Sequence, residues 1–170
     1  MVFACLLRVQ SEPLRPLSSI SSANGKLQVD LVIKNIDAMI NGHHVTGLRT
    51  YNGVFPGPTL QVQPGDTMNI RYINRLQADT NHPSSGAHGA AIDNVNLHTH
   101  GLNVSPEGYS DNVYLDILPA QWVPFEIHIP TNHPTGLFWY HPHRHGGVST
   151  QLGSALSGNI IITGKGDLDE

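Results

Sequence analysis

Two short segments of the sequence carry histidines at alternate positions, a spacing that suits metal binding. Residues 98–101 read His-Thr-His-Gly, and residues 141–146 read His-Pro-His-Arg-His-Gly. Residues i and i+2 of a β-strand point to the same face, about 7 Å apart along the strand. Each segment therefore presents two imidazoles side by side, and four imidazoles meet if the two strands are neighbours. Neutral imidazole suits copper, zinc, iron and nickel, whereas magnesium and calcium take oxygen ligands.

The two pairs favour a site with more than one metal ion. Imidazoles at i and i+2 of an extended strand are too far apart to chelate one small ion easily, but they can bind two ions a few ångströms apart. Gly101 and Gly146 allow the chain to turn directly after each pair, and Pro142 places the second pair at a strand end or edge. One His-x-His pair is commonly a chance surface feature, whereas two such pairs after apolar residues are a much stronger signal.

The rest of the 11 histidines stand in weaker contexts. His145 adjoins the second pair but has no pairing partner of its own, so its role as a ligand is left open. The others are expected to be solvated bystanders: His43, His44, His82, His88, His128 and His133.

Strands must position the histidine pairs, and the alternation of apolar and polar residues predicts about seven to nine short ones. The expected strands are 27–33, 45–51, 60–62, 68–72, 95–100, 125–129, 136–141 and 158–163. One or two helical turns are expected at 150–157 and a long surface loop at 77–92. Short strands separated by Gly- and Pro-containing turns favour an all-β sandwich or barrel with Greek-key connections.

Composition supports one globular domain and excludes several classes of protein. The chain has 170 residues, 39% of them apolar, and a net charge of -4, so it can bury a core. A single cysteine cannot form an internal disulfide, a Cys-rich zinc site or an iron–sulfur cluster. Lys and Arg are scattered, which disfavours nucleic-acid binding, and no apolar run approaches the ~18 residues of a membrane span.

The motifs taken together resemble those of the multicopper oxidases, the family of laccases, bacterial copper oxidases and related ferroxidases. The resemblance is to their N-terminal cupredoxin domain and covers roughly residues 27–164. It is carried by Tyr-Asn-Gly-Val-Phe-Pro-Gly-Pro-Thr at 51–59, the strand after Pro-Gly-Asp at 64–66, Asn-Leu-His-Thr-His-Gly at 96–101, and Gly-Leu-Phe-Trp-Tyr-His-Pro-His at 136–143 with Gln151 after it. It implies a cupredoxin-like Greek-key β-sandwich or barrel.

The resemblance also implies copper and a set of ligands. In the family the first pair supplies one ligand to a type 2 copper and one to a type 3 copper, which by position are His98 and His100. The second pair, here His141 and His143, supplies type 3 ligands. These residues would be half of the histidines of a trinuclear cluster that reduces O2 to water.

An acidic residue shortly after the first pair is thought to assist proton delivery to oxygen in this family. Asp111 has a suitable position and is the candidate catalytic residue, with Glu107 as the weaker candidate. A purely structural loop carboxylate is an almost equal alternative for Asp111.

The sequence departs from the family at the type 1 copper site, which needs a Cys thiolate with two His ligands. The only cysteine is Cys5, with no histidine nearby, and a later partner pair of histidines is also absent. The rest of the cluster is therefore expected from C-terminal cupredoxin domains of the same oxidase or from a second copper-domain chain. Residues 165–170 resemble the start of an interdomain linker or tail, which favours a fragment.

The sequence thus predicts three segments and one main function. Residues 1–25 are expected to be a flexible tail or leader remnant, and 26–164 the cupredoxin-like copper-binding domain of a laccase-like oxidase. We expect a periplasmic or secreted location, although the apolar stretch 2–7 is shorter than a signal-peptide core. An unidentified small reducing substrate and O2 are the expected reactants, with no nucleic acid and no membrane span. The alternative is a stand-alone, non-enzymatic copper-binding or storage module; a zinc hydrolase ranks low because no Glu general base adjoins either pair.

Overall fold

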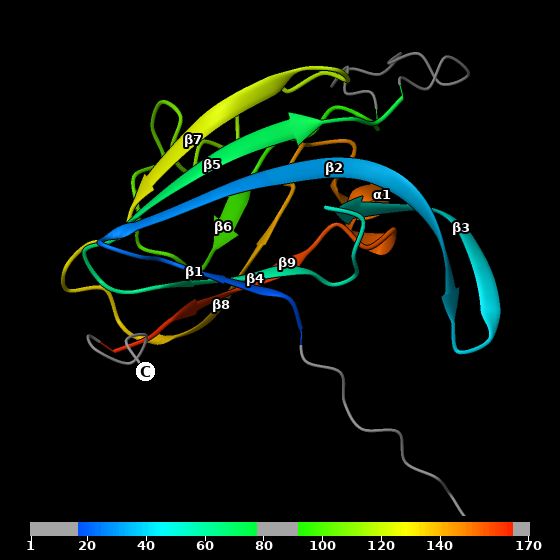
Figure 1. Cartoon of the computed structure of the whole chain (residues 1–170). Coiled ribbons are helices and arrows are strands. Elements are labelled where there is room, and N and C mark those ends of the chain that lie inside the picture. The colour runs from blue at the N-terminus through cyan, green and yellow to red at the C-terminus, as the bar shows by residue number, and fades with distance from the viewer. Residues whose placement is uncertain (1–16, 78–91, 165–170) are drawn as a thin grey trace, which may run out of the picture.

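Two β-sheets face each other in the computed structural model, which describes residues 17–77 and 92–164. The strands are β1 (Ser19–Ser21), β2 (Lys26–Ile40), β3 (His43–Tyr51), β4 (Gly57–Val62), β5 (Thr67–Asn74), β6 (His98–His100), β7 (Trp122–His128), β8 (Gly136–His141) and β9 (Gly158–Ile162), with the helix α1 at Val148–Gly153. One sheet has the order β1-β4-β9-β8-β6 and the other β3-β2-β5-β7 (Figure 1). The predicted all-β sandwich is confirmed.

Alternation of side chains explains why these segments form two facing sheets. On β5, Met68, Ile70 and Tyr72 are buried, while the residues between them face outward. Their partners on β2 and β7 continue the pattern, since Leu27 lies opposite Met68 and Phe125 opposite Ile70. Removing this apolar surface from water stabilises the sandwich by about 25 cal/mol per Å².

Three tyrosines are buried in the core, and the hydroxyl group of each has a hydrogen-bond partner. The Tyr51 and Tyr72 hydroxyls lie 3.1 Å apart, and Tyr72 also donates to the Asn96 carbonyl at 2.7 Å. Tyr140 donates to the Pro58 carbonyl at 2.8 Å. Burial raises the pKa of all three phenols, so they stay neutral donors. The core therefore buries these rings without leaving a hydroxyl unsatisfied.

The tail predicted over residues 1–25 is wrong for its last part. Ser19–Ser21 form β1, which pairs in parallel with Thr59–Gln61 of β4. The Ser22 amide then donates to the Gln61 carbonyl at 2.9 Å. Backbone hydrogen bonds to β4 hold this segment in place. The alternation of apolar and polar residues cannot predict such pairing in so short and polar a stretch. Residues 1–16 lie outside the described part of the chain.

The second strand is longer than expected, and with β3 it forms a hairpin that curls beyond the sandwich (Figure 1). The turn is Asn41-Gly42, with φ of 49° and 79°, and Asn-Gly is a favoured pair for a two-residue hairpin turn. A register irregularity between Ile36 and Ala38 bends the ribbon. The helical turns expected at 150–157 occur slightly earlier, as α1, and most of the predicted loop 77–92 lies outside the described residues.

Within the two described ranges, no helix is long and apolar enough to cross a membrane.

Candidate metal centre

The register between β6 and β8 brings the two histidine pairs together. The strands are antiparallel, with His98 opposite His141 and His100 opposite Trp139. Thr99 and Tyr140 alternate with these residues and point into the core. The imidazoles therefore share the outer face of the five-stranded sheet, as the i, i+2 spacing predicts.

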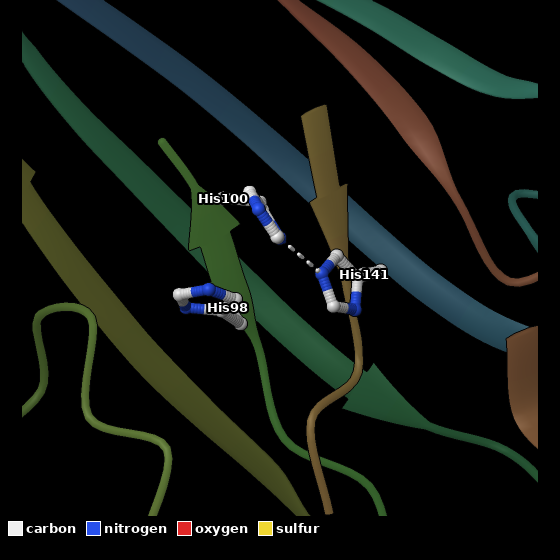
Figure 2. A group of neighbouring side chains, drawn as sticks. All are labelled: His98, His100 and His141. Carbon is white, nitrogen blue, oxygen red and sulfur yellow. Dashed lines mark hydrogen bonds between the residues drawn. The ribbon is translucent and has the colours of Figure 1, made fainter. Parts of the chain in front are cut away.

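The rings of His98, His100 and His141 gather in front of β6 and β8 (Figure 2). Their ring centroids lie 5.3–5.5 Å apart. One nitrogen from each ring can be chosen so that all three atoms lie within 4.8 Å of one another. A cluster of this size can share one or more metal ions, and it consists of imidazole alone, a donor type that suits copper.

The fourth predicted ligand, His143, follows β8 and lies beside His98. The two ring centroids are 5.1 Å apart, and the His143 amide donates to the Asn96 side-chain oxygen at 2.6 Å. His143 Nδ1 is buried and has no hydrogen-bond partner within the described segments. Such an atom is costly unless something binds it, so the ring fits a metal site. His145 is exposed with its ring 5.7 Å from that of His143, and its role stays open.

Asp111 holds His98 in one orientation. Its Oδ1 accepts a hydrogen bond from the Thr99 amide at 2.7 Å, and both carboxylate oxygens lie 3.1 Å from His98 Nδ1. Because a carboxylate can only accept, His98 carries its proton on Nδ1 and keeps Nε2 free for a metal. The structure thus places Asp111 beside the cluster. Glu107, the weaker candidate, instead lines a cavity on the four-stranded sheet.

His141 is the buried member of the cluster, and burial lowers its pKa to about 4. Its ring is therefore neutral at pH 7, the form that binds metal. Nδ1 donates to the Pro142 carbonyl at 2.9 Å, so Nε2 is the acceptor and takes a hydrogen bond from His100 Nδ1 at 3.2 Å. A metal on His141 Nε2 would replace this hydrogen bond between the rings.

Trp139 supports the cluster, and sequence reasoning missed this role. Its ring stacks on His141 at 4.0 Å between centroids and 22° between planes, and on His100 at 5.0 Å and 27°. A flat stack on both imidazoles restricts their rotation. The sequence spacing could have predicted this contact, since Trp139 stands two residues before His141 and so shares its face of the strand.

Asn96 was also missed as a supporting residue. It is fully buried. Its side-chain Nδ2 donates a hydrogen bond to the Val113 carbonyl at 2.5 Å, and its Oδ1 accepts one from the His143 amide. Asn96 thus ties the segment before β6 to the segment after β8. A buried asparagine close before the first pair was the available signal, because buried polar groups are nearly always hydrogen-bonded.

Three of the six expected bystanders are exposed as predicted, one is buried, and two lie outside the described residues. His43, His44 and His128 are exposed, whereas His82 and His88 lie outside the described residues. The prediction for His133 is wrong, because only 5% of it is exposed. Its Nε2 accepts a hydrogen bond from the Asn103 amide at 2.9 Å, and its Nδ1 donates one to the Pro134 carbonyl at 2.8 Å. His133 therefore anchors the loop after β6, a long-range contact that its polar sequence context concealed.

Replacing Asp111 with asparagine is expected to lower the copper affinity of the chain about 10- to 100-fold, because removing the outer hydrogen-bond partner of a metal-binding histidine has this effect. Competition with a chromophoric chelator measures it. Asp116→Asn is the matched control, since Asp116 pairs with Arg144 rather than with a histidine of the cluster. An affinity equal to that of the unmodified chain would show that Asp111 does not support the site.

The two-sheet β-sandwich is the architecture of a cupredoxin domain, and the imidazoles clustered on its outer face are consistent with a copper site. The chain belongs to the multicopper oxidase family, which residues 32–167 match. The predicted family and fold class are confirmed.

Individual relatives agree with the family assignment. Laccase-11 of Arabidopsis thaliana is 28% identical over 128 residues, which are 74% of this chain and 20% of that protein. Copper resistance protein A of Pseudomonas syringae pv. tomato is 29% identical over 140 residues, 81% of this chain and 19% of that protein. The chain therefore spans about a fifth of the length of these relatives.

Solved structures of similar fold agree with the family assignment. The multicopper oxidase of Campylobacter jejuni, a metallo-oxidase, has a TM-score of 0.72 at 28% identity, covering 93% of this chain and 31% of that one. A laccase of Pediococcus acidilactici has a TM-score of 0.71 at 19% identity, which supports the fold alone.

Proposed function

We propose that this chain is the copper-binding N-terminal domain of a laccase-like multicopper oxidase. In this proposal His98, His100, His141 and His143 supply half of the histidines of a trinuclear copper cluster. The register of β6 against β8 carries the proposal, because it sets His98 opposite His141 on the face that also holds His100. His143 follows directly after β8, with its ring 5.1 Å from that of His98. His98 would bind type 2 copper, and the other three would bind type 3 coppers.

The residues of this chain would have defined roles in such an enzyme. Copper, when bound, supplies one-electron chemistry for the reduction of O2 to water while a reducing substrate is oxidised. The strands β6 and β8 hold the imidazoles, and Trp139 limits their rotation. Asp111 keeps the proton of His98 on Nδ1. Its carboxylate is also close enough to the cluster for the proton delivery that we propose for it.

The remaining ligands would come from further cupredoxin domains of the same oxidase or from a second copper-domain chain. Two observations support this partner. The chain matches only 31% of the Campylobacter jejuni oxidase, and Leu137, on the same outer face as His141, is 71% exposed. An exposed large apolar side chain on the face that carries the imidazoles fits a surface that another domain covers. A periplasmic or secreted location stays a prediction.

A stand-alone copper-binding or storage module is the second candidate function. It is favoured by the three imidazole nitrogens that lie within 4.8 Å of one another and come from one chain. Such a site needs no second domain to hold one copper ion. In this case the protein would bind copper tightly without being an enzyme.

One set of measurements separates the two functions. The purified 170-residue chain is titrated with Cu(II) against a chelator and assayed for oxidation of a phenolic substrate with O2 uptake. As part of an oxidase, it is expected to bind copper weakly and to show no turnover. Tight binding that depends on all four histidines would support the storage function. Robust phenol oxidation by this chain alone would contradict both, because its one cysteine lies in no His-Cys-His segment.

A further inference from the structure

A cavity of about 660 Å³ lies on the four-stranded sheet, away from the histidines. Its floor is formed by β2, β5 and β7, where Gln28, Asn69 and Glu126 form one row of aligned residues. The wall is the segment containing Glu107 and Tyr109, which joins the edge of β7 because the Glu126 amide donates to the Tyr109 carbonyl at 2.8 Å. This volume is in the range of small-molecule sites.

Two aromatic side chains border the cavity and stay largely in contact with solvent. Trp122 is 59% exposed and Tyr109 is 57% exposed. They come from different elements, β7 and the loop beside it, and both line this one cavity. Aromatic faces attract cations, and Trp is the strongest of the three aromatic residues in this respect.

The charges that line the cavity are mainly negative. Arg71 is its only lining cation and makes a two-point ion pair with the neighbouring Asp30, through Nε at 3.0 Å and through Nη2. Glu107 and Glu126 also line the cavity, and neither has an ion pair to another residue of the described segments. With Arg71 neutralised by Asp30, two carboxylates remain for a ligand. Both carboxylates are exposed to solvent, so they repel an anion, attract a cation and add little for a neutral ligand.

We propose that this cavity binds a small organic cation of the alkylammonium class. The ammonium group lies against Trp122 and Tyr109, and Glu107 and Glu126 supply the opposite charge. Gln28 and Asn69 offer hydrogen bonds to a polar substituent of the ligand. No histidine lines this cavity, so the proposed ligand site does not depend on the copper function proposed above.

Titration with choline, compared with 3,3-dimethylbutan-1-ol, tests the need for charge, because the alcohol replaces the ammonium nitrogen with carbon and keeps the shape. Binding is followed by the indole N–H resonances of the ¹⁵N-labelled chain, which has only two tryptophans, Trp122 and Trp139. Choline is expected to shift the Trp122 signal saturably while the Trp139 signal stays in place. The alcohol is expected to bind about two- to fivefold more weakly, the range of an exposed cation–π contact.

Variants of the lining residues complete the test. Glu107→Gln and Glu126→Gln are each expected to weaken choline binding up to about fivefold, the range of an exposed ion pair, while leaving binding of the alcohol unchanged. Trp122→Leu is expected to weaken choline binding about two- to fivefold. Because this variant lacks the Trp122 indole signal, its binding is measured from the backbone amide resonances. Tyr114→Leu is the control, because Tyr114 is 90% exposed and lies outside the cavity. Equal affinity for choline and the alcohol, no shift of Trp122, or a shift of Trp139 alone would each overturn the proposal.

Discussion

Replacing His141 with alanine is expected to lower the affinity of the chain for Cu(II) by at least about 100-fold. His141 is the buried ring of the cluster and contacts both His98 and His100. Its low pKa keeps it neutral, so it binds metal without first losing a proton. Even loss of an outer hydrogen-bond partner costs a metal site about 10- to 100-fold, and loss of the ligand itself costs more. Chelator competition and the Cu(II) electron paramagnetic resonance spectrum measure the change.

His128→Ala is the matched control for this experiment. His128 is also a strand histidine, but it is exposed at the end of β7. Its replacement is expected to leave copper affinity within about twofold of the unmodified chain, since surface changes away from a site are nearly neutral. Thermal unfolding of both variants without copper confirms that they remain folded. If the His128 and His141 variants lost copper equally, binding would be nonspecific.

The second large effect is expected from Gly158→Ala, although Gly158 lies outside the histidine cluster. Gly158 is paired with Tyr140, and a Cβ atom at this position would overlap the Tyr140 ring. Tyr140 cannot move freely, because it is buried against Tyr51 at 5.0 Å between centroids and donates to the Pro58 carbonyl. Overpacking typically costs about 1–3 kcal/mol of unfolding free energy, and this overlap with a fixed ring is expected at the upper end, about 3 kcal/mol. We expect the melting temperature to fall by about 10 °C.

The same substitution is expected to weaken copper binding, because Tyr140 stands between Trp139 and His141 on β8. Displacing its ring would shift the strand that presents His141. Gly153→Ala is the control, since an added Cβ meets no atom within 4 Å at this last residue of α1. It should be neutral or stabilise by up to about 1 kcal/mol. A Gly158→Ala chain as stable as the Gly153→Ala chain would show that Tyr140 can repack.

Local pattern alone determined much of this protein. Period-two alternation predicted the main strands, and the His-x-His spacing predicted that each pair shares one face. Both follow from the geometry of a single extended chain, which acts over a few residues. The all-imidazole donor set already favoured a transition metal over magnesium or calcium.

Only the tertiary structure decided how the two pairs meet. His98 faces His141 across two strands that are far apart in sequence, and their register depends on the packing of both sheet faces. The roles of Trp139 and Asn96, the burial of His133 and the pairing of β1 also arise from contacts between distant segments. No short stretch of sequence encodes such contacts, because each needs a partner that the folded sheets bring to it.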